Sequence, residues 1–388
     1  MSLREKITRE TRAAGAIPFS RYMEMCLYDQ EYGYYSRNVE QFGKAGDFYT
    51  SSDVHAVFGR LLARQFEEMW RVLGSPGRVE VLELGPGRGL FARDVLDWSK
   101  KKFPEFFQAL QYSLWERSAV LQERLKTSLE RHFASGRVSF SRRLKLPCSG
   151  DLYAAAEAVP SQGPVLVFAN EFFDALPVEV VSPNGELRIT EKDGRFVEIW
   201  TRPSAENLEY LDSYSVRPEA EEQVEAARAA QSYMTQVAAS IERGFLMVIG
   251  YGYVRAEQLA GRHRGTVAAY RQHSVSANPY EAPGQQDITA HVNFTALAAA
   301  AEQQGMKVQP LLTQSQFLMG IGESTQFADA FEDCRLPPEH AKVALQLKHL
   351  VTPAGMGESF QVLVASKGVP GEQAASLKGL SFGRLNKK

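Results

Sequence analysis

The stretch that decides the fold lies at residues 79–89 and reads VEVLELGPGRG. Its first six residues are mostly apolar, which is typical of a buried parallel strand. Gly85, Gly87 and Gly89 follow at alternate positions. Glycine adopts positive φ angles without steric cost and lets a ligand approach the backbone. A helix after this loop would point its free N–H groups at the same space, so the stretch predicts a site for a carboxylate or a phosphate.

Strand-like and helix-like segments alternate on both sides of this loop. The alternation indicates an α/β protein with a doubly wound, mostly parallel sheet and right-handed crossovers. We expect seven strands in the sheet and helices between them. The expected strands are 79–84, 112–115, 137–140, 164–169, 244–249, 307–312 and 360–366, and the expected helices are 90–102, 119–133 and 291–305.

The pattern divides the chain into four parts. Residues 1–75 are rich in aromatic side chains at helical spacing and predict an N-terminal helical cover. Asn184-Gly185 and Asp193-Gly194 are hairpin signals that open an insertion, which we expect to continue as a long helix over 217–242. We expect 261–287 to form a loop. The predicted parts are the cover (1–75), a Rossmann-like core (76–177 and 244–368), the insertion (178–243) and a C-terminal tail (369–388).

Composition excludes several classes of protein. The formal net charge of −2 gives no overall attraction to nucleic acid. The three cysteines are far apart and form no CxxC pair, so we expect neither a metal cluster nor a disulfide framework. His263, His273 and His291 lack a metal-ligand spacing, and no metal is expected. The charged start and the short apolar runs predict a cytoplasmic protein without a membrane span.

Two acidic residues flank the glycine loop. Glu116 follows the second strand, where a carboxylate can accept hydrogen bonds from both ribose hydroxyls. Glu83 ends the first strand and could face an ammonium group. This arrangement suits adenosine joined to an amino acid better than a pyrophosphate. A dehydrogenase is disfavoured because its glycines are usually spaced GxGxxG, whereas these are spaced GxGxG. The alternative is a tight turn that binds no ligand.

A second group of polar residues, NEFFDALP, occupies 170–177 after the fourth strand. Ligands of open α/β sheets bind at the carboxyl ends of the strands, so Asn170, Glu171 and Asp174 are the candidate catalytic residues. Two carboxylates among aromatic rings can hold a guanidinium and favour its nucleophilic nitrogen. The alternative is that Phe172 and Phe173 belong to the core and that the acids cap a helix.

At these segments the chain resembles the MidA-like family of class I S-adenosylmethionine-dependent methyltransferases, bacterial relatives of a mitochondrial complex I assembly factor. The resemblance spans nearly the whole chain. The matching residues are Arg21-Tyr22-Met23, Gly33-Tyr34-Tyr35, 46–51, 83–89, 169–177, Gly284, 287–292, Phe294, Thr313-Gln314 and 318–322.

The resemblance implies roles for several residues of the cofactor site. Gly85, Pro86, Gly87 and Gly89 would shape the S-adenosylmethionine pocket. Glu116 would bind ribose, and Asn170 would also contact the cofactor. Asp47 and Thr50 belong to a loop expected to close over it.

For the mitochondrial member, the implied product is symmetrically dimethylated arginine on a complex I subunit. A protein substrate is therefore expected here too, with a respiratory-complex subunit implied by resemblance alone. One position departs from the family pattern, because Gly250 stands where the family usually has Asp before Tyr-Gly. If that aspartate orients the acceptor or the cofactor loop, activity would be reduced or redirected.

Two alternatives to a protein-arginine methyltransferase stay open. One is methyl transfer to a small molecule, which a narrow and closed pocket would favour. The other is a non-catalytic assembly or scaffold protein that binds the cofactor without turnover, for which Gly250 is the main support. The sequence leaves the substrate, the degree of methylation and the oligomeric state open.

Overall fold

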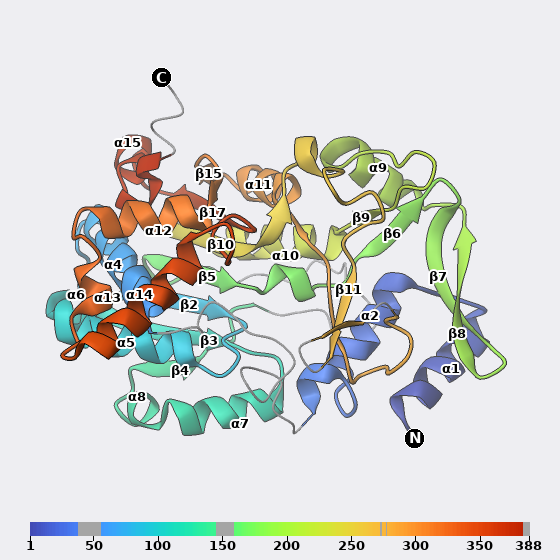
Figure 1. Ribbon diagram of the computed structural model, residues 1–388, viewed down its shortest axis with the longest axis horizontal. Coiled ribbons are helices and arrows are strands. Elements are labelled where there is room, and N and C mark those ends of the chain that lie inside the picture. Colours follow the sequence, from blue (N-terminus) through green and yellow to red (C-terminus); the bar gives the residue numbers. More distant parts are fainter. Residues whose placement is uncertain (38–55, 145–158, 272–273, 277, 383–388) are drawn as a thin grey trace.

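The computed structural model describes residues 1–37, 56–144, 159–271, 274–276 and 278–382, and its centre is one mixed β-sheet (Figure 1). The sheet has nine strands, seven of them in one continuous order. These seven are β15 (Lys307–Val308), β17 (Phe360–Lys367), β10 (Gly244–Tyr253), β5 (Val165–Asn170), β2 (Val79–Leu84), β3 (Leu110–Trp115) and β4 (Val138–Phe140).

The strands from β10 to β4 are mutually parallel, and β17 is antiparallel to β10. The doubly wound, mostly parallel sheet is therefore confirmed. The strand expected over 307–312 is instead two short strands, β15 and β16 (Leu312–Thr313), which both pair with β17. Pro310 lies between them and has no N–H to donate to a ladder.

Helices cover both faces of the sheet and bury two apolar clusters. Figure 1 shows α10 (Arg228–Ala239) and α11 (Phe294–Gln303) away from the group formed by α4 (Val57–Val72), α5 (Leu90–Lys102), α12 (Gln314–Glu323), α13 (Ala328–Phe331) and α14 (Pro337–Val351). The α4 side also carries α6 (Pro104–Ala109), α7 (Ala119–Ser128) and α8 (Glu130–Ala134). The helix expected over 119–133 is therefore two helices.

The N-terminal segment packs on the insertion. It contains α1 (Leu3–Ala14), β1 (Ile17–Pro18), α2 (Phe19–Tyr28) and the short helix η1 (Tyr34–Ser36). Strand β1 pairs with β7 of the insertion, Ile17 opposite Ile189. Helix α4, by contrast, packs against α5 on the sheet. The division of the chain into a cover, a core and an insertion stays a prediction.

The insertion forms a sheet of its own with β1. Its elements are β6 (Glu179–Ser182), β7 (Gly185–Lys192), β8 (Arg195–Thr201), α9 (Ala205–Tyr214) and β9 (Val224–Ala226). Asp193 and Gly194 both have positive φ angles, 51° and 76°, as the predicted hairpin turn between β7 and β8 requires. The long helix expected over 217–242 is wrong, because β9 pairs with β6 and α10 begins only at Arg228.

Two further expectations need correction, and the tail contains regular structure. The loop expected over 261–287 contains the strands β11 (Ala268–Arg271), β12 (Ser274–Ser276) and the first residue of β13 (Asp287–Thr289), which pair as a small sheet. His291 does not open a helix, since β14 (Val292–Asn293) follows it and Asn293 caps α11. The tail includes α15 (Gly371–Ala375) and η5 (Lys378–Leu380), where the N–H of Gly379 donates to Gln65 Oε1 at 3.0 Å.

Two short helices complete the described elements, η3 (Phe173–Ala175) and η4 (Arg255–Glu257). None of the helices in the described ranges is both long and apolar enough to cross a membrane.

Replacing Phe168 with Ala should destabilise the fold strongly. Phe168 is fully buried on β5, and its ring stacks on Phe91 with centroids 4.4 Å apart. Losing a buried phenylalanine costs about 3–5 kcal/mol of unfolding free energy. Urea denaturation followed by circular dichroism measures this loss. As the control, Leu345→Ala on α14 removes a side chain that is 68% exposed, and should change the free energy by no more than ~0.5 kcal/mol. Equal losses in both variants would contradict the packing described.

Candidate active site

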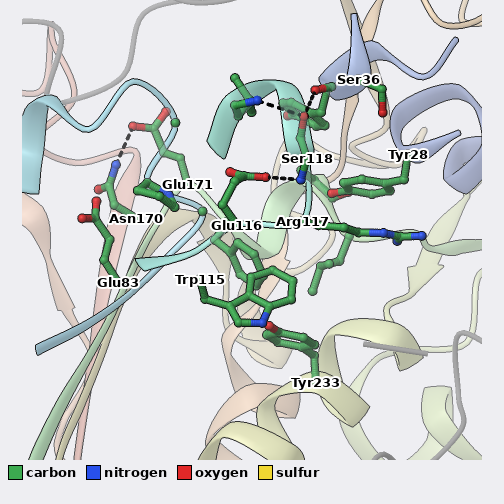
Figure 2. A pocket seen from close by; sticks show the side chains of 18 of the residues that line it. Tyr28, Ser36, Glu83, Trp115, Glu116, Arg117, Ser118, Asn170, Glu171 and Tyr233 are labelled. Carbon is green, nitrogen blue, oxygen red and sulfur yellow. Dashed lines mark hydrogen bonds between the residues drawn. The ribbon is translucent and has the colours of Figure 1, made fainter. Parts of the chain in front are cut away.

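A cavity of about 490 Å³ lies at the carboxyl ends of β2, β3 and β5 (Figure 2). Parallel strands with helices on both faces leave a crevice at this edge, where ligands of such folds bind. The cavity is lined by the glycine loop, the ends of β3 and β5, helix α10 and the N-terminal segment. Among its lining residues are Tyr28, Tyr35, Glu83, Gly85, Pro86, Gly87, Trp115, Glu116, Asn170, Glu171, Tyr233 and Gln236.

The glycine loop has the backbone conformation that its sequence predicts. Gly85, Gly87 and Gly89 have φ angles of 64°, 52° and 74°. A Cβ atom on Gly85 would lie 2.8 Å from the ring of Phe172, and one on Gly89 would lie 2.8 Å from Leu125 Cδ2. Gly85 and Gly87 line the cavity, whereas Gly89 caps α5 and allows it to pack closely.

Glu83 lies at the edge of the cavity and is only 4% exposed. Its Oε2 accepts a hydrogen bond of 2.8 Å from the Tyr112 hydroxyl on β3. Burial raises the pKa of Glu83 to about 8, and the hydrogen bond from Tyr112 opposes this rise. A cationic ligand would favour the ionised form, so Glu83 is placed to face an ammonium group.

Glu116 directly follows β3 and also lines the cavity. Its Oε1 accepts a hydrogen bond of 2.7 Å from the N–H of Ser118, which fixes the carboxylate toward the cavity (Figure 2). Burial raises the pKa of Glu116 to about 7, although the N–H groups of Ser118 and Arg117 lower it. The neighbouring Trp115 lines the cavity as well.

Two of the three candidate catalytic residues lie together. The Nδ2 of Asn170 donates to Glu171 Oε1 at 3.0 Å, and both residues line the cavity (Figure 2). Glu171 has a φ of 50°, which is unfavourable for a side chain with a Cβ, and its N–H donates to Ile249 O at 2.9 Å. Strain of this kind is often found at functional sites.

Asp174 lies apart from this pair. It is 7% exposed, does not line the cavity, and its backbone carbonyl accepts a hydrogen bond from the N–H of Ala290. Burial raises the pKa of its carboxyl to about 6, while the N–H groups of Asp174 and Ala175 lower it. Phe172 lines the cavity, whereas Phe173 belongs to the core.

The N-terminal segment contributes two tyrosines that the sequence did not assign to the site. The Tyr28 hydroxyl donates to Ala175 O at 2.9 Å, and that of Tyr35 donates to Asp287 Oδ1 at 3.0 Å. Their rings stack with centroids 5.6 Å apart. The cluster of tyrosines at 32–35 was the available signal. Asp47 and Thr50 lie outside the described residues.

Gly250 lies on β10, beside β14. A Cβ atom at this position would meet only Val292 Cγ2, at an ordinary contact distance of 3.5 Å. The backbone therefore does not require glycine here, and the effect of this departure on activity stays a prediction.

The residues of the cavity fit S-adenosylmethionine. Asn170 Oδ1 is buried and has no hydrogen-bond partner within the described ranges, so it can accept from the ammonium group together with Glu83. The N–H groups at the start of α5 can bind the carboxylate, and Glu116 can bind the ribose. The apolar walls suit the remaining parts of the cofactor.

The fold and this cavity define a class I, Rossmann-like methyltransferase. Residues 61–312, more than half of the chain, match the Methyltransf_28 family of S-adenosyl-L-methionine-dependent methyltransferases. The chain belongs to this family, and S-adenosylmethionine is its cofactor.

Several known proteins are similar over most of the chain. The mitochondrial protein arginine methyltransferase NDUFAF7 homolog of Drosophila melanogaster is 28% identical over 397 residues, which cover 95% of this chain and 85% of that protein. Protein arginine methyltransferase NDUFAF7 of Danio rerio is 29% identical, with 93% and 86% covered. A Burkholderia thailandensis structure of the methyl transferase class, bound to S-adenosyl-homocysteine, has a TM-score of 0.81 at 28% identity and covers 98% of this chain and 94% of its own.

Gly87→Val should abolish cofactor binding. Gly87 has a positive φ angle, which is unfavourable for a β-branched residue. It also lines the cavity, so a valine side chain there would occupy space that the cofactor needs. Calorimetric titration should show saturable binding of S-adenosylmethionine to the wild type, no binding to the variant, and no binding of NADH to either. Binding of NADH alone would contradict the assignment of the cavity.

Affinity for S-adenosylmethionine should fall at low pH. Ribose hydroxyls donate to the ionised Glu116, whose pKa in the free protein is about 7, so protonation of Glu116 between pH 8 and pH 6 should by itself weaken binding by about tenfold, and protonation of Glu83, whose pKa is about 8, should weaken it further. Calorimetry across this range measures the change. In Glu116→Gln the affinity should be lower and the contribution of Glu116 to the pH dependence should vanish. The same pH dependence in both proteins would assign it to another group.

Proposed function

We propose that this methyltransferase modifies arginine side chains of a protein substrate. The observation that carries the proposal is the pair Asn170 and Glu171 in the cavity wall, at the strand end next to the cofactor loop. A carboxylate matches the charge and the hydrogen-bond donors of a guanidinium. Relatives that are similar along most of the chain are named protein arginine methyltransferases.

The reaction requires a nucleophilic nitrogen in line with the methyl group that S-adenosylmethionine supplies. Glu171 would orient the guanidinium and accept the proton that the attacking nitrogen loses. Asn170 would fix the Glu171 carboxylate through the hydrogen bond to Oε1. Asp174 does not line the cavity, and the hydrogen bond between η3 and Ala290 uses its backbone carbonyl, so a role of its carboxylate in holding the acceptor stays a prediction.

Methyl transfer to a small molecule is the second candidate. Tyr28 and Tyr35 of the N-terminal segment form part of the cavity wall, and aromatic walls of this kind suit a small acceptor. A cytoplasmic location, a respiratory-complex subunit as the substrate, and the use of the fold as a non-catalytic scaffold stay predictions.

Glu171→Gln should retain cofactor affinity and lower turnover by orders of magnitude. The substitution keeps the size of the side chain and removes its ability to accept a proton. Transfer of a labelled methyl group to cellular proteins, followed by hydrolysis and identification of methylarginine, measures turnover. Calorimetry with S-adenosylmethionine measures affinity separately.

The matched control for this variant is Glu198→Gln. Glu198 lies on β8, is exposed, and accepts a hydrogen bond from the Tyr280 hydroxyl away from the cavity. Its substitution should leave both quantities unchanged. Wild-type turnover in Glu171→Gln would overturn the assignment of the base, and a labelled small molecule without labelled protein would favour the second candidate.

A further inference from the structure

Helix α10 contributes one polar face to the cavity. Its lining residues are Ala229, Tyr233 and Gln236, and their spacing of four and then three residues places them on the same side of the helix. Tyr233 is 2% exposed and Gln236 is 7% exposed. In the described part of the chain, neither Tyr233 Oη nor Gln236 Oε1 has a hydrogen-bond partner, although both atoms are buried.

A buried polar atom without a hydrogen-bond partner costs free energy of folding. Two such atoms in a cavity wall therefore indicate a ligand that forms hydrogen bonds with them. Two atoms of this kind on adjacent turns of one helix can contact the same small planar group.

The surroundings indicate which part of the cofactor would fit here. The Tyr233 ring packs against Trp115 and Phe172, with centroids 5.6 and 5.2 Å apart. Trp115 immediately precedes Glu116, the residue placed to bind ribose. Figure 2 shows Trp115 and Tyr233 on one side of Glu116, and Glu83, Asn170 and Glu171 on the other. The base attached to the ribose therefore has the α10 wall within reach.

The chemistry of the two side chains fits an aminopurine. A glutamine amide pairs with adenine by accepting from the 6-amino group and donating to the adjacent ring nitrogen. Burial, Tyr28 and Glu116 all raise the pKa of Tyr233, so its hydroxyl stays protonated and can donate to a second ring nitrogen. The aromatic rings of Trp115 and Phe172 supply apolar walls for a flat base.

We propose that Gln236 and Tyr233 form the adenine subsite of the cavity, in which Gln236 Oε1 accepts from the 6-amino group and the Tyr233 hydroxyl donates to a ring nitrogen. The competing occupant is the methyl acceptor. A guanidinium would need a carboxylate beside it. Glu116, the carboxylate near Tyr233, is the candidate ribose ligand, and Glu171 lies with Asn170 on the opposite side of Glu116 (Figure 2).

The test compares two ligands by calorimetry on the intact protein: S-adenosylhomocysteine, and its analogue with hydrogen in place of the 6-amino group. The wild type should bind S-adenosylhomocysteine roughly tenfold or more tightly than the analogue, because the analogue leaves the buried amide oxygen unpaired. Equal binding of the two ligands by the wild type would overturn the proposal without any variant.

Two variants separate the roles of the residues. Gln236→Met should weaken binding of S-adenosylhomocysteine and bring the ratio between the ligands to about one, since the amide that reads the amino group is gone. Tyr233→Phe should weaken the binding of both ligands and preserve the ratio of their affinities, because both ligands have the ring nitrogen that accepts from the Tyr233 hydroxyl. A Gln236→Met variant that weakens both ligands equally would show that Gln236 only packs. Unchanged affinities in Tyr233→Phe would remove Tyr233 from the subsite.

The control is Gln231→Met, which makes the same substitution on α10 at a residue that does not line the cavity. Its affinities and their ratio should equal those of the wild type. The experiment uses no methyl acceptor, so its outcome does not depend on the proposed arginine substrate. A negative result for the adenine subsite would not contradict the arginine substrate, and a negative result for the arginine substrate would not contradict the adenine subsite.

Discussion

The close packing of the glycine loop against the end of β3 and against the Phe172 ring, which follows β5, is the constraint on which the site depends. Gly85 donates its N–H to Trp115 O at 3.0 Å while its Cα faces the ring of Phe172. A side chain at Gly85 would separate the loop from the strand end that carries Asn170 and Glu171. The same packing therefore holds the cofactor loop, the end of β3 that leads to Glu116, and the candidate acceptor residues in one place.

Burial prepares the carboxylates of the site for ligands. Glu83 and Glu116 both have raised pKa values because little water reaches them, so ionising either group in the free protein costs free energy. A cation or a pair of hydroxyl groups offsets that cost when it binds. A ligand in this cavity therefore meets polar groups that water solvates poorly, and Asn170 Oδ1, which has no hydrogen-bond partner among the described residues, is another such group.

The N-terminal segment links the insertion to the cavity. Strand β1 adds to the insertion sheet through its pairing with β7, and α2 then leads to Tyr28 and Tyr35 in the cavity wall. The Ser118 hydroxyl donates to Tyr35 O at 2.7 Å, and the N–H of Ser118 donates to Glu116. Hydrogen bonds therefore connect the Glu116 carboxylate, the candidate ribose ligand, to the N-terminal segment.

The sequence by itself determined the parallel core, the glycine loop and the positions of Glu83, Glu116, Asn170 and Glu171, because these features depend on periodicity and on strand ends that always meet at one edge of a sheet. Only the tertiary structure decided which side chains from distant elements complete the cavity. The α10 residues read as an ordinary helix in sequence, and β9, β11 and β12 are too short to show a period. Asp174 is close to Glu171 in sequence, yet it lies in η3 and does not line the cavity. The direction that the chain takes after a strand end is set by tertiary packing, and the local sequence pattern does not reveal it.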